Sequence, residues 1–534
     1  MIIQVVHDLL EHSAHVFSGK EAIFFKNKSM SFYEIREKSA RLGGFLNSIG
    51  SQRGDRVAIY LEKRFEKVIS IFGISISGGV FVPVRRLLHV NQVGHIISDC
   101  QAKVLITTGD RIPLLKTIAH KLSSLEFIIV ISNKKENINY KLGRAKVLDW
   151  EDAIFFAANK RRHDAVENDL AAILYTSGST GNPKGVVLSH LNIVAGAKKV
   201  SEYLKMTQDD RLLSILTFAF DYGLNQLTGA FLHGAQVVLL DYLFPSDIIK
   251  AVNKYSITGL AAVATTWIQL LQSQWTHEDV PTLRYITNSG GAIPEYYVRE
   301  LRKRIPITDI YLMYGLTEAF RSTYLDPKLV DEKPTSMGKA IPGEEILVLD
   351  ADDKPIKPGQ IGQLVHRGVL VAQGYWNAPD ITAIRYRVNP LQAKEIPIKE
   401  MVVYSGDYVR MDEDGFLYFI GRNDEMIKSA GNRISPTEVE EILYSTGKIQ
   451  DTIVLGIPHK IYGHAIKALI VPRENTSITA AEIIEYCKKM SPPYMIPSDI
   501  EFRKELPRNA NGKLDRARVK KEIYQNLSEE NKSE

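Results

Sequence analysis

The chain has 534 residues, of which 45 % are apolar and 24 % are charged. This balance is typical of a globular protein and excludes a largely disordered chain, and at roughly 150 residues per domain the length predicts about three to four compact units. Lys and Arg (67) exceed Asp and Glu (62) by a net charge of only +5, which is too small for a dedicated nucleic-acid binder.

The cysteines and the start of the chain indicate the compartment. Cys100 and Cys487 allow at most one pair, which excludes a disulfide-stapled secreted scaffold and favours a reducing environment. Residues 1–15 predict an amphipathic helix rather than an export signal, because acidic residues interrupt them and no basic region leads them. The longest uncharged stretch, 255–276, is diluted by polar residues and glycine, so no membrane span is expected. We therefore expect a cytoplasmic protein.

Residues 56 to about 348 show short β-branched runs that alternate with helical patterns, which favours parallel strands joined by helical crossovers. Strands are expected at 56–61, 102–107, 127–132, 171–176, 236–240 and 258–263. Between 345 and 422 the pattern changes to short alternating strands with Gly and Pro turns, which predicts a small antiparallel subdomain.

The last part of the chain has a different order of elements. After residue 422 the pattern predicts helix 437–445, strands 452–457 and 465–471, helix 480–490 and strand 499–503. The fold class is therefore α/β, with a large N-terminal domain over 1–422 that holds doubly wound sheets and the β-rich subdomain. A small α+β domain over 423–534 follows, and its size is within the usual range for a domain.

Several common catalytic motifs do not occur in the sequence. No Gly-x-Gly pair is present, so a Rossmann dehydrogenase is not expected, and neither G-x-S-x-G nor H-E-x-x-H occurs. His7, His12 and His15 lie on the first expected helix, where a solvated face explains them better than a metal site does.

The strongest signal is YTSGSTGNPKG, residues 175–185, which follows an apolar strand and precedes a helical pattern that starts near Ser189. Its glycines let backbone N–H groups approach an anion, its hydroxyls can donate, and Lys184 supplies positive charge. Pro183 stands where a Walker A loop needs glycine. The segment therefore predicts a polyphosphate-binding loop and disfavours a P-loop kinase or ATPase.

Four further blocks follow this loop along the chain. They are NSGGAIP at 288–294, YGLTEAF at 314–320, the segment from YSGD to TEVE at 404–440, and LPRNANGKLDR at 506–516. In this order the five blocks resemble the adenylate-forming superfamily of acyl-CoA synthetases, peptide-synthetase adenylation domains and luciferases. Within it, the chain is most similar to bacterial AMP-forming acyl-CoA ligases associated with exopolysaccharide and exosortase gene clusters. The resemblance implies that an acid and ATP give an acyl-adenylate and pyrophosphate, after which a thiol displaces AMP.

The resemblance also implies how ATP is bound. The pyrophosphate would be held by Thr176, Ser177, Gly178, Ser179, Thr180, Gly181 and Lys184. Adenine would lie beside Gly290, Gly291 and Ala292 and stack on Tyr314, and the ribose would contact Asp407 and Arg422. Thr317 would donate to the phosphate and Glu318 would coordinate Mg²⁺, a hard cation that prefers oxygen ligands. Core packing for Tyr314 and tight turns for the glycines and Asp407 are the simpler alternatives.

The C-terminal blocks imply a mobile domain. Lys513 matches the lysine that bridges the carboxylate and the α-phosphate during adenylation, and Asp424 matches the hinge about which this domain swivels between the two half-reactions. The residues that match the thiol approach are Lys428, Gly431 and Arg433. Surface charge is an equal explanation for the two cations among them.

The segment LTFAFDYGLNQL, residues 216–227, lies where the family places acid specificity. Asp221 resembles the carboxylate of amino-acid-activating domains that pairs with a substrate ammonium, and a helix-capping Asp is the even alternative. The residues expected to face the acid are Phe220, Asp221, Tyr222, Asn225, Ser289, Met313 and Arg321. A long acyl chain would leave Asp221 and Arg321 unpaired at a heavy cost, unless they form an ion pair at the pocket floor. Both cases predict a small polar acid.

The sequence therefore predicts an ATP- and Mg²⁺-dependent acid–thiol ligase, with coenzyme A or the phosphopantetheine of a separate carrier protein as acceptor. One alternative is an amino-acid-adenylating enzyme that loads such a carrier. Another is a non-catalytic nucleotide-binding regulator, which the presence of Lys184, Glu318, Asp407 and Lys513 disfavours. The segment FVPVRRLLH at 81–89 departs from the family and is expected to alter the N-terminal packing.

Overall fold

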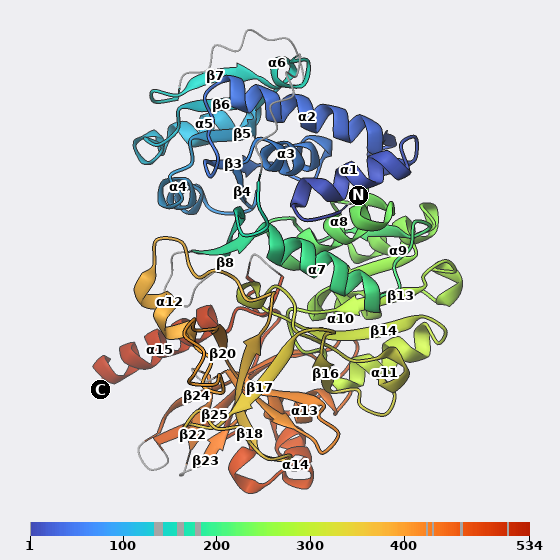
Figure 1. Cartoon of the computed structure of the whole chain (residues 1–534). Helices are drawn as coiled ribbons and strands as arrows, with labels where there is room; N and C mark the ends of the chain where they lie inside the picture. Colours follow the sequence, from blue (N-terminus) through green and yellow to red (C-terminus); the bar gives the residue numbers. More distant parts are fainter. Residues whose placement is uncertain are drawn as a thin grey trace.

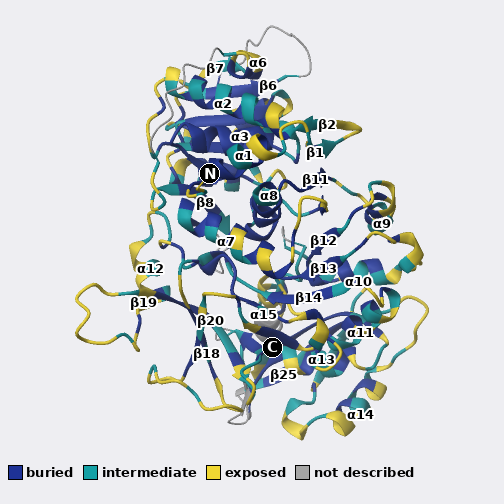
Figure 2. Ribbon diagram, turned by 45° about the vertical axis from the view of Figure 1, so that its right-hand side comes forward, coloured by how far each residue is buried: buried dark blue, intermediate teal, exposed yellow. Residues whose placement is uncertain are grey.

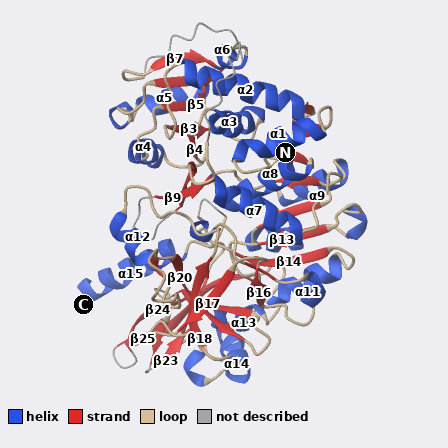
Figure 3. Ribbon diagram, in the orientation of Figure 1, coloured by secondary structure: helices blue, strands red, loops and turns tan. Residues whose placement is uncertain are grey.

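The computed structural model describes residues 2–132, 142–156, 165–176, 183–422, 425–429, 432–459, 463–509 and 512–533. In these ranges the strands form three sheets, of seven, fourteen and five strands. Figure 1 shows the seven-stranded sheet at one end of the molecule and the five-stranded sheet at the other, with helices on the sheets throughout (Figure 3). The arrangement confirms the α/β class with a large N-terminal and a small C-terminal unit.

The seven-stranded sheet is the first α/β unit. In sheet order its strands are β7 (Lys146–Asp149), β6 (Phe127–Ile131), β5 (Val104–Thr108), β3 (Arg56–Tyr60), β4 (Val80–Pro83), β8 (Leu170–Thr176) and β9 (Lys184–Ser189). All neighbours pair in parallel except β8 and β9. Near-continuous apolar runs are typical of such buried parallel strands. The accompanying helices are α2 (Phe32–Ser48), α3 (Phe65–Ile76), α4 (Val90–Asp99), α5 (Ile112–Lys116) and α6 (Trp150–Ile154).

One half of the fourteen-stranded sheet is also mainly parallel. Its strands are β2 (Lys28–Ser31), β1 (Glu21–Phe25), β11 (Gln236–Leu239), β10 (Arg211–Ser214), β12 (Gly259–Ala262), β13 (Tyr285–Asn288) and β14 (Asp309–Tyr314). The edge strand β2 pairs antiparallel with β1. The helices of this half are α7 (His190–Tyr203), α8 (Asp221–His233), α9 (Pro245–Lys254), α10 (Ala264–Gln272) and α11 (Glu295–Arg304).

The other half is antiparallel. It contains β15 (Thr323–Tyr324), β16 (Ser336–Ala340), β21 (Leu417–Arg422), β20 (Met401–Met411), β18 (Ile361–Arg367), β17 (Glu345–Leu349) and β19 (Tyr386–Val388), with helix α12 (Pro379–Arg385). The strands expected between 345 and 422 are therefore present, but they continue the parallel sheet. β15, a strand of two residues, and β16 join β14 to β21 by antiparallel pairing. A strand as short as β15 leaves no periodicity in the sequence, which is why the connection was not predicted.

Helices α1 (Val6–Val16), α7 and α8 lie between the two larger sheets. Phe72 of α3 stacks on Phe231 of α8 with ring centroids 5.0 Å apart, and Phe32 of α2 meets the same ring edge-on at 5.2 Å. All three rings are buried, and the ribbons of α3 and α8 are mostly in the dark blue of buried residues in Figure 2. The buried Lys63 donates to the carbonyl oxygens of Ser214 and Ile215 at 3.0 and 2.8 Å. This lysine fixes the carboxyl end of β10 against the seven-stranded sheet.

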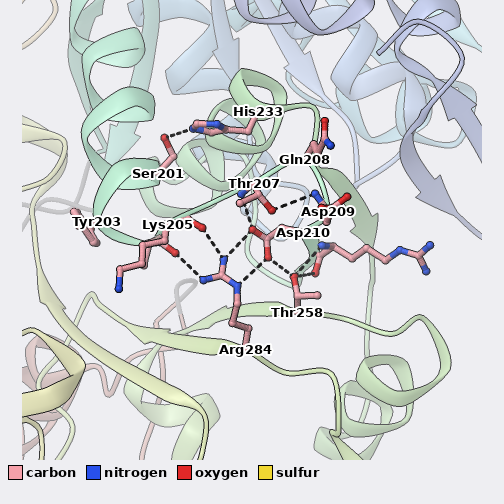
Figure 4. A network of polar contacts seen from close by, with 12 residues as sticks. Ser201, Tyr203, Lys205, Thr207, Gln208, Asp209, Asp210, His233, Thr258 and Arg284 are labelled. Carbon is pink, nitrogen blue, oxygen red and sulfur yellow. Dashed lines mark hydrogen bonds and ion pairs between the residues drawn. The ribbon is translucent and has the colours of Figure 1, made fainter. Parts of the chain in front are cut away.

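A polar network holds the opposite end of the parallel strands (Figure 4). The guanidinium of Arg284, the residue before β13, donates to both carboxylate oxygens of Asp210 at 2.8 and 3.3 Å and to the carbonyl of Leu204 at 3.1 Å. The Thr258 hydroxyl donates to the same carboxylate at 2.6 Å. Because these groups precede β10, β12 and β13, they hold together the strands whose far ends carry the sequence blocks described above.

The C-terminal unit has the order of elements that the sequence predicts. Its strands are β23 (Asn432–Ile434), β22 (Ile427–Ser429), β25 (Gly463–Pro472), β24 (Ile449–His459) and β26 (Asp499–Phe502), and its helices are α13 (Pro436–Tyr444), α14 (Ala480–Met490) and α15 (Arg516–Ser533). Among the helices that the structure describes, none is both long enough and apolar enough to cross a lipid bilayer.

Helix α11 is the surface on which this unit docks. The Tyr297 hydroxyl donates to a carbonyl of β24 at 3.0 Å, and the Arg473 guanidinium lies 4.4 Å from the ring centroid of Tyr296 and 4.9 Å from that of Tyr297. At the start of α11 the backbone N–H of Glu295 donates to the Glu441 carboxylate at 3.3 Å. Burial raises the pKa of Glu441 to about 7.

Candidate active site

Most of the blocks singled out in the sequence meet at one edge of the fourteen-stranded sheet. The block at 288–294 follows β13, the block at 314–320 follows β14, and Asp221 opens the helix that comes after β10. These strands run in parallel, so their carboxyl ends lie together. Crevices outside the carboxyl ends of parallel strands are where ligands bind in open α/β sheets.

The glycine-rich loop joins two strands rather than a strand and a helix. Thr176 ends β8 and pairs with Lys184, the first residue of β9, and α7 begins only at His190 with Ser189 as its cap. The predicted helix start near Ser189 is therefore correct, but the sequence did not reveal the intervening strand. Ser177, Gly178, Ser179, Thr180 and Gly181 lie outside the described residues.

Tyr314 and Asp407 meet across the site. The Tyr314 hydroxyl donates to Oδ2 of Asp407 at 2.5 Å, while one face of its ring stacks on His366 with centroids 6.0 Å apart. Burial lowers the pKa of His366 to about 3, so this imidazole is neutral. Asp407 stands opposite Arg422 in the register of β20 and β21, with Oδ1 and Nε 3.8 Å apart. Tyrosine, carboxylate and guanidinium are thus placed together, as the predicted ribose and adenine contacts require.

Glu318 and Thr317 lie in the 3₁₀ turn that follows β14. The Tyr375 hydroxyl donates to Oε1 of Glu318 at 2.5 Å, which leaves its other oxygen for a ligand. In the described part of the chain no cluster of three or more metal-ligating side chains occurs. A single carboxylate fits Mg²⁺, which proteins often hold through one or two carboxylates together with substrate phosphates. The donor set here therefore suits a cation that arrives with a polyphosphate.

Lys513 reaches this site from the C-terminal unit. A Cβ built on Gly290 would lie 3.2 Å from Cε of Lys513, 3.5 Å from its Nζ and 3.5 Å from the Phe220 ring. Gly290 has φ +82, and the absence of a side chain lets the lysine lie on its backbone. Thr265 of α10 donates to the Gly512 carbonyl at 2.8 Å and holds the lysine loop in place. Burial lowers the pKa of Lys513, against the raising fields of Asp221 and Asp407.

Asp221 and Arg321 form a buried ion pair beside this lysine. Nη1 of Arg321 donates to Oδ2 of Asp221 at 3.0 Å, and the Thr317 hydroxyl donates to Oδ1 at 3.0 Å. Asp221 is 1 % and Arg321 3 % exposed. Asp221 is the first residue of α8 rather than its cap, which is Phe220, so the capping interpretation is wrong. Because its hydrogen goes to Asp221, the Thr317 hydroxyl must rotate before it can donate to a phosphate.

A strained turn directs Arg321 inward. Phe320 has φ +48, an uncommon conformation for a residue with a side chain. Its buried ring fills the space over Gly196 of α7, where a Cβ would approach the ring to 2.4 Å. This contact holds the reversed backbone, so that the guanidinium of Arg321 lies 4.7 Å from the centroid of the Tyr222 ring.

The remaining predicted pocket residues surround this pair. Tyr222 and Thr287 share a hydrogen bond of 2.5 Å between their hydroxyls, and Asn225, Ser289 and Met313 are buried. Beyond them Tyr203 stacks on Tyr324 with centroids 4.1 Å apart. A cavity lined by Tyr222, Asn225 and Met313 has a volume of about 20 Å³, room for about one water molecule. Aromatic side chains therefore close the pocket behind the ion pair.

Some predicted residues cannot be placed in this way. Asp424 and Gly431 lie outside the described residues. Lys428 and Arg433 face each other in the register of β22 and β23. The expected role of Lys428 and Arg433 at the thiol approach stays a prediction.

Sequence reasoning missed three side chains of the site. Tyr375 and His366 contact Glu318 and Tyr314 but belong to no predicted block. Arg85 lies in the atypical segment after β4, and burial lowers its pKa to about 10 against the opposing field of Asp221. Residues directly after a parallel strand lie at the edge of the sheet where ligands bind, so the position of Arg85 after β4 could have marked it as a candidate site residue.

Comparison with known proteins agrees with this geometry. Residues 10–376 match the family described as AMP-binding enzyme, and residues 438–513 match its C-terminal domain. The chain belongs to the AMP-binding enzyme family. A long-chain-fatty-acid–CoA ligase of Bacillus subtilis (strain 168) is 29 % identical over 548 residues, which cover 98 % of this chain and 95 % of that protein.

Solved structures show the same likeness. The anthranilate CoA ligase AuaEII in complex with anthranoyl-AMP has a TM-score of 0.89 at 26 % identity, with 99 % of each chain covered. The o-succinylbenzoate coenzyme A synthetase MenE of Bacillus subtilis, in complex with ATP and magnesium ion, has a TM-score of 0.80 at 25 % identity, covering 96 % of this chain and 99 % of that one. The family resemblance predicted from five blocks is confirmed, and so is the reaction class, an adenylate-forming acid–CoA ligase.

Proposed function

We propose that this protein uses ATP and Mg²⁺ to activate a small polar carboxylic acid as its acyl-adenylate, and then transfers the acyl group to coenzyme A. The observation that carries this proposal is the position of Lys513. A Cβ built on Gly290 would lie 3.5 Å from both this ammonium and the Phe220 ring, next to the acid pocket, although Lys513 belongs to the C-terminal unit. A cation at this point is suited to neutralise the charge that develops when a carboxylate attacks the α-phosphorus.

Each half of the site supplies one part of the adenylation step. Tyr314, Asp407 and Arg422 hold the nucleoside, while Thr176 and Lys184 flank the loop that holds the leaving pyrophosphate. Glu318 would hold the Mg²⁺, which when bound would neutralise phosphate charge. Lys513 orients the attacking carboxylate and the α-phosphate, and the bond between the α- and β-phosphates breaks as the acyl–phosphate bond forms.

The ion pair supports a small acid rather than a long acyl chain. Long-chain acids are named for the Bacillus subtilis relative, but here Asp221 and Arg321 lie across the pocket and tyrosine rings close it. A fatty chain in contact with this pair would have to desolvate charged groups without hydrogen-bonding to them, which is costly. A polar acid can donate to or accept from them instead.

After adenylation we propose that the C-terminal unit, residues 423–534, turns about Asp424. The turn withdraws Lys513 and brings Lys428, Gly431 and Arg433 to the thiol. The thiolate then attacks the acyl carbon and AMP leaves. A carrier-protein phosphopantetheine would present the same thiol chemistry, and a comparison of the two acceptors separates these cases.

The experiment is a measurement of pyrophosphate release with ATP and Mg²⁺ across amino acids, hydroxy acids, dicarboxylic acids, aryl acids and fatty acids. We expect release that depends on a small polar acid and that coenzyme A stimulates. Preference for a fatty acid would overturn the substrate proposal, and no stimulation by coenzyme A would favour a carrier protein. Absence of release with every acid would overturn the proposed reaction and favour a nucleotide-binding regulator.

A further inference from the structure

Arg321 is only partly satisfied in its buried position. Its Nη1 is bonded to Asp221, but Nε and Nη2 have no hydrogen-bond partner among the residues that the structure describes. The face of the guanidinium lies on the Tyr222 ring, so the free groups are on its edge. A buried guanidinium with two unpartnered donors is costly unless a ligand completes it.

The two unpartnered nitrogens of Arg321, Nε and Nη2, carry N–H groups that point in the same direction. In a planar guanidinium the N–H of Nε and one N–H of Nη2 are parallel, and together they match the two oxygens of a carboxylate. Such a bidentate pair is stronger and more selective than a single contact. We infer that the acid activated by this protein is a short dicarboxylic acid, whose second carboxylate binds side-on to Nε and Nη2 of Arg321. This inference rests on the proposed function.

A second donor points to the same chemistry. Nδ2 of Asn225, a residue only 5 % exposed, also has no hydrogen-bond partner in the described part of the chain. Asn225 lies on the same helix as Asp221, one turn further along α8, and it borders the small cavity behind Tyr222. An amide N–H and a guanidinium fork form a donor-rich site, which selects oxygen acceptors over amines.

The charges around the pocket favour an anion. Asp221 and Arg321 cancel each other, and Arg85 lies within range of the Asp221 field, which opposes the lowering of the Arg85 pKa by burial. Lys513 serves the carboxylate that reacts, so Arg85 adds positive charge to the surroundings of the pair. Asp221 already pairs with Arg321 and accepts a hydrogen bond from Thr317, so its charge is balanced before any substrate ammonium arrives. The structure therefore opposes the amino-acid alternative.

The length of the acid is limited at both ends. On the proposed function the reacting carboxylate would lie at Lys513, which approaches Gly290 together with the Phe220 ring, and Arg321 contacts Asp221, the residue that follows Phe220. Behind the ion pair there is a cavity of about 20 Å³. Few carbons can therefore separate the two carboxylates, as in malonate, succinate and glutarate.

The test compares each dicarboxylic acid with its monomethyl ester and with the monocarboxylic acid of the same length, by pyrophosphate release. The ester keeps the size but removes the second charge. We expect kcat/KM for the best diacid to exceed that of its ester by about 10-fold to 100-fold, the range that a charge-assisted pair gives. In Arg321→Lys the cation can still pair with Asp221, but it offers no fork. We expect this variant to lose most of the ratio between diacid and ester.

Two controls separate the outcomes. Arg518→Gln changes an exposed arginine on α15 and is expected to leave the ratio as it is in the unaltered protein. An ester or monoacid used as well as the diacid, or a ratio that survives in Arg321→Lys, would overturn the dicarboxylate inference while the ligase proposal stands. If no acid in the panel supports release, the proposed function itself fails and this inference falls with it.

Discussion

The ion pair between Asp221 and Arg321 makes a prediction about stability that does not depend on the substrate. Asp221→Asn keeps the size of the side chain but removes its charge, so that a guanidinium that is only 3 % exposed loses its counter-ion. Both side chains of the pair are 2 % exposed, so water cannot replace the lost partner. Breaking a pair this deeply buried by removing one partner costs about 3–5 kcal/mol. We expect the free energy of unfolding to fall by that amount.

The double variant Asp221→Asn with Arg321→Met provides the matched comparison. It removes both charges and leaves an apolar side chain of similar length over the Tyr222 ring. Replacing both members of a buried pair in this way is often close to neutral, so we expect most of the lost stability to return. Urea unfolding followed by circular dichroism measures both variants. If Asp221→Asn alone costs less than about 1 kcal/mol, the range of ordinary surface changes, water reaches this pair and the reasoning is refuted.

Three further predictions concern the reaction and the docked C-terminal unit. Lys513→Ala should abolish pyrophosphate release yet leave transfer from a supplied acyl-adenylate largely intact, and equal loss in a thiol-transfer assay would contradict its role. Glu318→Gln should raise the Mg²⁺ concentration needed for half-maximal release, with Tyr375→Phe showing a smaller rise; identical Mg²⁺ curves would remove Glu318 from the metal site. Burial raises the pKa of Glu441 from 4.5 to about 7, so the docked form holds the extra proton and docking weakens as pH rises through that interval. The thermal midpoint should fall over the same interval, and Glu441→Gln should flatten the dependence.

Much of the fold could be predicted because periodicity and strand-like runs are local. The helix expected at 480–490 has those bounds in the structure, and the strand expected at 127–132 differs from β6 by one residue. The continuity of the large sheet could not be predicted, because it depends on β15, a strand of two residues between distant partners. The hairpin at the phosphate loop was missed for a related reason, since the short apolar run of β9 is adjacent to the start of α7.

The candidate site could also be predicted only in part from the sequence. Motif spacing brought together Tyr314, Glu318, Asp407 and Lys513 as candidate residues, and the structure joins Tyr314 to Asp407 and brings Lys513 to Gly290. The spacing of motifs does not show which polar side chains form hydrogen bonds or ion pairs with one another. The sequence left an Asp221–Arg321 ion pair as one of two alternatives, and the structure shows that it forms at the turn of Phe320. Tyr375 and His366 come from segments without a recognisable motif. Arg85 lies in the segment 81–89, whose departure from the family pattern is visible in the sequence. Where this arginine lies relative to Asp221 depends on how the sheets assemble.

The strand β21 has a consequence for the thermodynamics of the whole cycle. It ends at Arg422, opposite Asp407, and the C-terminal sheet begins only a few residues later at β22. The pair proposed to hold the ribose is therefore also the fixed end of the connection between the two units. Linkage is reciprocal: if the nucleotide favours one orientation of the C-terminal unit, that orientation binds the nucleotide more tightly by the same factor. The affinity for AMP and the approach of the thiol then depend on the same equilibrium between the two orientations of the C-terminal unit.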